Sequence, residues 1–97
     1  MSITVKSTPE NITIILGKQL DFSSVEEFRR AYLDQDVKTC IIDFRDTEYM
    51  DSSGLGMLLN MKRHLKDKTD DIRLINCRPQ VKKILLISRF ELKFTIS

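Results

Sequence analysis

One stretch, residues 49–56 with the sequence YMDSSGLG, gathers the polar groups of this chain that could do chemistry. It holds a carboxylate, Asp51, and two hydroxyls, Ser52 and Ser53, between an apolar strand-like segment and a helical pattern. In α/β proteins, sites are usually built where strands end. Asp and Ser also cap helices, because their oxygens accept hydrogen bonds from free backbone N–H groups. The stretch is therefore either a strong helix cap or a site whose hydroxyl a partner can reach.

Two glycines, Gly54 and Gly56, come after the serines. Glycine inside a helix costs about 1 kcal/mol relative to alanine, so two of them in a first turn need a reason. We expect another group to approach the backbone closely at this point.

A catalytic role for Ser53 would need partners that the sequence does not supply. A nucleophilic serine requires a base within hydrogen-bond reach, and the single histidine, His64, lies about 16 Å further along the helix. Asp51 stands where a nucleophile elbow has glycine. The chain also shows no metal-ligand spacing and no phosphate-binding loop. We therefore expect no enzyme activity, no metal and no cofactor.

The composition is that of an ordinary globular protein, with 41% hydrophobic and 31% charged residues. Residues 1–97 have room for one domain. The net charge of +2 gives no basis for nucleic-acid binding. No apolar run approaches the ~18 residues that indicate membrane insertion, and the N-terminus has no signal-peptide core. Two cysteines, Cys40 and Cys77, are no disulfide framework and favour reduced thiols in a cytoplasmic protein.

The apolar pattern predicts strands that alternate with helices. The expected strands are residues 2–6, 12–16, 37–44, 72–76 and 91–96, with the first two antiparallel. The expected helices begin at Ser23 or Ser24 in a capping box with Glu26 or Glu27, at Leu55 and at Pro79. Strand 37–44 is apolar enough to be buried on both faces. The order predicts an α/β fold, a mixed β-sheet with parallel central strands and helices packed over it.

The motif DSSGLG at residues 51–56, preceded by Asp46, Tyr49 and Met50, closely resembles the signature of STAS domains. Within that family it is most similar to the bacterial anti-sigma factor antagonists. The resemblance runs from about Leu16 to Phe90, which is most of the chain. It implies that residues 1–97 form a STAS-like domain.

The resemblance also implies a regulatory circuit. The unphosphorylated antagonist binds an anti-sigma factor, a serine kinase of the histidine-kinase-like ATPase fold, and so releases a sigma factor. The kinase phosphorylates the second serine of the pair, here Ser53, which breaks the complex, and a PP2C-type phosphatase restores it. Asp21 matches an aspartate that the family carries beside the phosphoacceptor, although it could also be a plain turn residue. The implied partner-binding residues are Asp21, Phe22, Asp51, Ser52, Ser53 and Gly54, on a chain that is a monomer when alone.

Phosphorylation of Ser53 would add about −1.5 to −2 charges at the start of a helix. The free N–H groups and the dipole of that helix tolerate a negative charge, so we expect the fold to survive. Asp21 and Asp51 already make this region acidic. The added dianion should therefore repel an acidic partner or obstruct a closely fitting one.

Several positions depart from the family pattern. Lys18 and Arg78 stand where the family has glycine and serine, and residues 88–90 replace a turn of a small residue and glycine. A chain that stops at Ser97 would also lack most of the antagonists' C-terminal helix. Three alternatives stay open: a STAS interaction module of a transporter or stress-sensing assembly, partner switching in a non-sigma signalling assembly, and a small-ligand or nucleotide-binding module. The intact serine pair favours partner switching over the transporter role.

The helix of residues 55–65 has two stripes at helical spacing. Its core face is expected to consist of Leu55, Leu58, Leu59 and Leu65. A second stripe at helical spacing consists of Met57, Asn60, Met61 and His64. Because surface positions rarely need methionine, we predict that Met57 and Met61 form the apolar centre of the partner interface. The alternative is that a neighbouring helix covers them.

Overall fold

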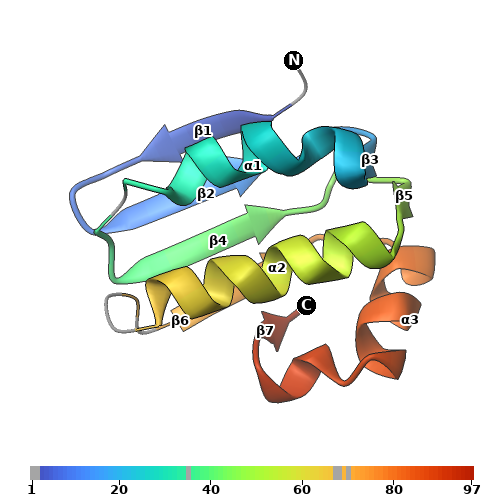
Figure 1. Ribbon diagram of the computed structural model, residues 1–97. Helices are drawn as coiled ribbons and strands as arrows, with labels where there is room; N and C mark the ends of the chain where they lie inside the picture. The colour runs from blue at the N-terminus through green and yellow to red at the C-terminus, as the bar shows by residue number, and fades with distance from the viewer. Residues whose placement is uncertain (1–2, 35, 67–68, 70) are drawn as a thin grey trace.

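A five-stranded sheet forms the centre of the computed structural model, which describes residues 3–34, 36–66, 69 and 71–97 (Figure 1). In spatial order its strands are β1 (Thr4–Ser7), β2 (Asn11–Ile15), β4 (Thr39–Asp43), β6 (Asp71–Ile75) and β7 (Thr95–Ile96). β1 is antiparallel to β2, and every other neighbouring pair is parallel. The mixed sheet with parallel central strands is therefore confirmed.

Three α-helices connect the parallel strands: α1 (Val25–Tyr32), α2 (Ser52–Leu65) and α3 (Pro79–Ile87). α1 and α2 lie side by side in front of the sheet in Figure 1, and they contact each other. None of the described helices is both long and apolar enough to cross a membrane.

The sheet buries one face more completely than the other. The strand residues on the better buried face are Ile12, Ile14, Cys40, Ile42, Ile72 and Leu74. On the opposite face, Ile41 of β4 is only half-buried and its neighbour Arg73 is exposed. The prediction that this strand is buried on both faces was wrong, because its alternate side chains point to a face that the neighbouring elements cover only in part.

The first helix starts differently from the predicted capping box. A short 3-10 helix, η1 (Phe22–Ser24), precedes α1, and Asp21 caps it. Ser24 makes no side-chain hydrogen bond as a cap, and its hydroxyl instead donates to the Gln19 carbonyl at 3.4 Å. The Ser24 N–H, which the box would join to Glu27, donates to the Asp21 carbonyl at 2.9 Å, and Glu27 instead accepts a hydrogen bond from the Ile3 N–H at 3.1 Å. The prediction was wrong because Asp21 already begins the helical path.

The last strand is shorter than residues 91–96. A 3-10 helix, η2 (Phe90–Leu92), takes up its first part, and β7 keeps only Thr95–Ile96. Phe90 and Phe94 are both buried and their rings stack with centroids 5.4 Å apart. Helical spacing allows this contact, whereas a strand would place residues i and i+4 about 13 Å apart. Residues 1, 2, 35, 67, 68 and 70 lie outside the described residues, so the expected start of the first strand at residue 2 stays a prediction.

Candidate functional site

Two very short strands hold the start of α2. β3 (Gln19–Leu20) and β5 (Tyr49–Met50) pair in parallel, apart from the main sheet, and lie together at the end of the molecule where α2 begins (Figure 1). An aspartate comes directly after each strand, Asp21 after β3 and Asp51 after β5. The Asp51 N–H points to the Leu20 carbonyl at 3.5 Å. The pairing therefore brings the segment that begins at Asp21 next to residues 51–54, although 30 residues separate the two aspartates in the sequence.

Asp51 is the N-cap of α2. Its Oδ1 accepts hydrogen bonds from the N–H groups of Ser53 at 2.9 Å and Gly54 at 3.2 Å. Its backbone is extended, as is usual for a cap residue. The expected capping role of Asp51 is confirmed, and the helix begins at Ser52 rather than at Leu55.

Gly54 lies where no side chain would fit. A Cβ at this position would lie 2.5 Å from Met50 Cγ and 2.7 Å from the Leu20 carbonyl oxygen. A Cβ at Gly56 would meet nothing within 4 Å. The expected close approach is therefore confirmed for Gly54 and wrong for Gly56. Through Gly54, the first turn of α2 packs directly against both short strands.

The two serines are the first residues of α2. Ser52 is exposed and Ser53 is half-buried. Neither hydroxyl makes a hydrogen bond to any residue that the structure describes, whereas the Ser23 hydroxyl in the neighbouring turn donates to Asp21. The free N–H groups and the dipole of a 14-residue helix create a positive potential around them. The position can thus hold a reactive hydroxyl or an anionic modification.

Two exposed aromatic side chains belong to the same pair of short strands and their turns. Phe22 is 75% exposed and Tyr49 is 54% exposed. From the sequence, Phe22 was expected in the site and Tyr49 was not. The sequence offered no alternation signal for Tyr49, because β5 has only two residues; in the structure its side chain points away from the side on which Met50 is buried. Large exposed rings on the segments that hold the start of α2 are suited to a protein contact.

A buried carboxylate supports the loop that leads to β5. Asp43 is fully buried, and it accepts hydrogen bonds from Arg45 Nε at 2.8 Å, from the Arg45 N–H at 2.9 Å and from Asn76 Nδ2 at 3.0 Å. Burial acts to raise the pKa of this carboxyl, but these hydrogen bonds outweigh burial and hold the pKa below its ordinary value. Further along the loop, the buried Thr47 hydroxyl donates to the Gly17 carbonyl at 2.8 Å. From the sequence, Asp43 was expected only as part of a strand.

The two methionines lie away from this site. Met57 is 6% exposed and Met61 is fully buried, with its Sδ 4.0 Å from Cys40 Sγ in the sheet. Met57 lies beside Phe28 and Tyr32 of α1, where these residues line one hollow between the helices. The prediction that Met57 and Met61 form an exposed partner interface was wrong, because α1 covers Met57 and Met61 is buried against the sheet. The alternative, a neighbouring helix, is the arrangement found at Met57.

His64 joins the two helices. Its Nε2 lies 2.9 Å from the Leu33 carbonyl, and its ring packs edge-on against Tyr32 with centroids 5.6 Å apart. It lies 11 residues after Ser53, roughly 16 Å along α2, too far to act as a base. Within the described ranges, no three His, Cys, Asp or Glu side chains are grouped to hold a metal ion. Both cysteines are free thiols, and burial raises their pKa to about 12 for Cys40 and about 11 for Cys77.

Comparisons with known proteins agree with this arrangement. The family model described as the STAS domain matches residues 2–97. A STAS-domain containing protein of Pseudomonas aeruginosa (strain UCBPP-PA14) is 40% identical over 90 residues, covering 91% of this chain and 89% of that protein. The anti-sigma F factor antagonist of Lysinibacillus sphaericus is 32% identical over 85 residues, covering 84% of this chain and 73% of that protein.

Solved structures of one such protein are also similar. The anti-sigma factor antagonist SpoIIAA in its unphosphorylated form superposes with a TM-score of 0.81 at 28% identity, covering 99% of this chain and 88% of that chain. The phosphorylated form of the Bacillus SpoIIAA superposes with a TM-score of 0.71 at 26% identity, covering 99% of this chain and 91% of that chain.

Proposed function

The chain belongs to the STAS domain family, and on that premise we propose that it is an anti-sigma factor antagonist controlled by phosphorylation of Ser53. The unphosphorylated chain binds an anti-sigma factor, a serine kinase of the histidine-kinase-like ATPase fold, and thereby releases a sigma factor. The kinase phosphorylates Ser53 and the complex dissociates. A PP2C-type phosphatase removes the phosphate and restores binding.

The relatives support this proposal. The Lysinibacillus relative is an anti-sigma F factor antagonist, and SpoIIAA is an antagonist known in unphosphorylated and phosphorylated forms. We propose that this chain likewise acts as a regulator rather than as an enzyme, as a monomer in the cytoplasm. Its role needs a protein surface and an accessible hydroxyl, and it needs no catalytic residues of its own.

The observation that carries the proposal is the setting of the Ser53 hydroxyl. The hydroxyl makes no hydrogen bond within the described part of the chain, and its backbone N–H is held by Asp51. Gly54 fixes the same turn against β3 and β5. A kinase therefore meets an unengaged hydroxyl at a rigid position, while the ATP and the metal come from the kinase itself.

The same geometry explains why a phosphate would break the complex and leave the fold intact. Inside the domain, the dianion lies at the N-terminus of α2, where a negative charge is worth about 0.3–1 kcal/mol of stabilisation. On the surface, the dianion adds to the charges of Asp21 and Asp51, on the paired segments that also carry the exposed rings of Phe22 and Tyr49. A partner that covers these rings would have to bury an unpaired dianion, which is strongly unfavourable.

The test is capture of the partner from lysate of the source organism by tagged variants of the chain. We expect the wild type and Ser53→Ala to retain a serine kinase of the stated fold, identified by mass spectrometry. Ser53→Asp should retain at least about tenfold less, although one carboxylate imitates a dianion imperfectly. Ser7→Asp is the matched control, because Ser7 is exposed at the far end of β1 and receives the same charge. Equal capture by all four proteins, or no kinase, would contradict the proposal.

A further inference from the structure

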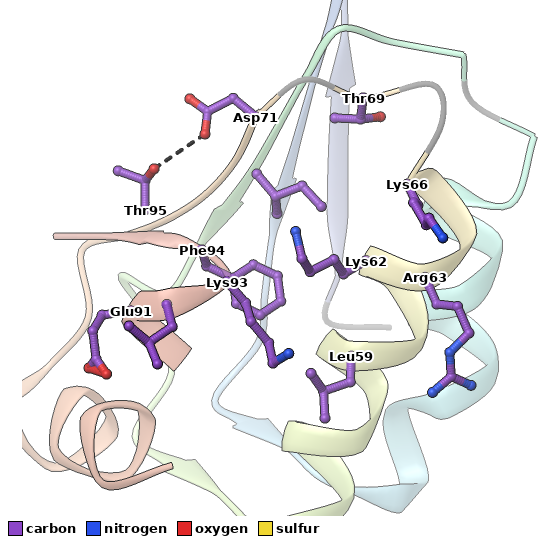
Figure 2. Close-up of a pocket in the computed structure, with 12 residues that line it drawn as sticks. Leu59, Lys62, Arg63, Lys66, Thr69, Asp71, Glu91, Lys93, Phe94 and Thr95 are labelled. Atoms are coloured by element: carbon purple, nitrogen blue, oxygen red, sulfur yellow. Dashed lines mark hydrogen bonds between the residues drawn. The ribbon is translucent and has the colours of Figure 1, made fainter. Parts of the chain in front are cut away.

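A groove lies beside the C-terminal half of α2, away from the serines (Figure 2). Its volume is about 610 Å³. α2 forms one wall and the segment from η2 to β7 forms the other, and the nearly buried side chains of Ile72 and Phe94 lie between them. Nothing in the partner-switching proposal uses this groove.

The α2 wall has the spacing of a helix-packing surface. It consists of Leu59, Lys62, Arg63 and Lys66, at positions i, i+3, i+4 and i+7. These residues span two turns, roughly 10 Å of helix axis. Leu59 is only half-buried, and Leu92 on the other wall is 75% exposed. The groove therefore leaves apolar surface available on both walls.

The charges around the groove are mainly positive. Lys62, Arg63, Lys66 and Lys93 line it, against the carboxylates of Asp71 and Glu91. Asp71 already accepts hydrogen bonds from Arg73 at 2.6 Å and from Thr95 at 3.2 Å, the latter drawn in Figure 2. In the described ranges the ion pairs are Arg45–Asp43 and Arg73–Asp71, and neither involves a groove cation.

The excess of positive charge extends over the second half of the sequence. Residues 52–97 hold ten of the sixteen basic residues and four of the fourteen acidic ones, counting Asp67, Lys68 and Asp70 outside the described residues. Lys62 also lies over the Phe94 ring, with Nζ 5.7 Å from the ring centroid, so its charge is directed at the apolar surface of the groove. A matching occupant has an apolar face and acidic flanks.

We propose that this groove docks a short acidic amphipathic helix of a partner protein, two to three turns long. Its apolar residues pack on Leu59 and Leu92, and its acidic residues face Lys62 and Lys93. A helix fits because the stripe on α2 offers the ridges and grooves against which helices pack. An added strand fits less well, because β7 is only two residues long and offers few backbone partners.

This docking surface is independent of the phosphorylation site. Lys62 lies nine residues and Lys66 thirteen residues after Ser53, which is roughly 13 and 20 Å along α2. Both distances exceed the Debye length of about 8 Å at physiological ionic strength. A phosphate on Ser53 should therefore leave the affinity of the groove unchanged.

The experiment is an NMR titration of the ¹⁵N-labelled full chain with a synthetic three-turn peptide of Leu and Glu, whose leucines lie on one helical face. We expect amide shifts at Leu59, Lys62 and Phe94, with residues 49–56 unaffected. A double variant, Lys62→Glu with Lys93→Glu, should lose at least about tenfold in affinity. Lys82→Glu with Lys83→Glu, on the exposed side of α3, makes the same charge change elsewhere and should bind as wild type. Ser53→Asp should also bind as wild type.

Several results would overturn the proposal. One is that the amide chemical shifts of the groove residues do not change when the peptide is added. Another is equal binding by a peptide with Lys in place of every Glu. Undiminished affinity of the Lys62/Lys93 double variant would exclude the charge match. The same shifts with sodium sulfate alone would make this a small-anion site. Shifts that depend on protein concentration without peptide would make the occupant a second copy of the chain.

Discussion

The molecule makes nearly the same turn twice, after β3 and after β5. In each turn an aspartate Oδ1 accepts a hydrogen bond from the N–H two residues later, Ser23 after Asp21 at 3.0 Å and Ser53 after Asp51 at 2.9 Å. The first turn opens a three-residue 3-10 helix, and the second opens a 14-residue α-helix. The Ser23 hydroxyl is engaged by Asp21, whereas the Ser53 hydroxyl has no partner among the described residues. An aspartate cap alone therefore does not make a site, and the residues after the cap determine whether its serine stays accessible.

The residue after each of these serines differs as well. Ser24 in the first turn is buried, and its hydroxyl donates to the Gln19 carbonyl. Gly54 in the second turn has no side chain, and the Leu20 carbonyl and Met50 occupy the space. The backbone of the second turn is thus packed against the Leu20 carbonyl and the Met50 side chain. The phosphorylation that we propose would use the unengaged hydroxyl of this turn.

The largest effect that we expect is a difference in stability between alanine variants of the two glycines of α2. Gly54→Ala places a Cβ against the Leu20 carbonyl, which is backbone and cannot yield cheaply, so we expect a loss of about 2–3 kcal/mol in unfolding free energy. Gly56→Ala meets nothing and should gain about 0.5–1 kcal/mol through helix propensity. Urea denaturation of both variants measures the difference. Equal stabilities would show that the second turn is not tightly packed.

The next effect concerns Asp43, which supports the second turn through the loop before β5. Asp43→Ala removes the acceptor of Asn76 and of the Arg45 N–H, and should cost about 1–3 kcal/mol. The folded pKa of Asp43 is lowered, so its contribution is present above the unfolded value of about 3.9 and is lost as pH falls below it.

Thermal melts as a function of pH check this expectation. Asp43→Asn should reduce the loss of stability below about pH 4. Some acid sensitivity should remain, because the hydrogen bond from Arg73 also lowers the pKa of Asp71. If Asp43→Asn loses stability in acid to the same extent as the wild type does, Asp43 does not support the turn.

The smallest effect compares the two caps directly. Asp51→Ala leaves the N–H groups of Ser53 and Gly54 without a side-chain acceptor and should cost about 1–2 kcal/mol. Asp21→Ala affects only a three-residue helix and should cost less than about 1 kcal/mol. Both values come from urea denaturation. A larger loss for Asp21→Ala would reverse our ranking of the turns.

Much of this arrangement could be predicted from the sequence. Period and cap signals are local, so they located the parallel strands, the Asp51 cap and the close approach at Gly54. β3 and β5 have only two residues each, too few to show any alternation, so their pairing could not be predicted. The burial of Asp43 also depends on Arg45 and Asn76, which come together only in the folded chain.

The methionine stripe shows a second limit. Helical spacing correctly grouped Met57 and Met61 on one side of α2, but spacing does not say which neighbour packs there. The capping box near Ser24 failed for a related reason, because Asp21 competes for the same helix start. Local patterns predict faces and ends, and tertiary contacts decide which of them are covered.

Phosphosite mapping is the sharpest test of the difference between the two turns. The wild-type chain, Ser53→Ala, Ser52→Ala and Ser23→Ala are each incubated with ATP and the serine kinases of the histidine-kinase-like ATPase fold from the source organism. Mass spectrometry then locates any phosphate. We expect one kinase to modify Ser53 in the wild type, Ser52→Ala and Ser23→Ala, and to leave Ser53→Ala unmodified. Full incorporation into Ser53→Ala, or a phosphate on Ser23, would contradict the distinction between the two turns.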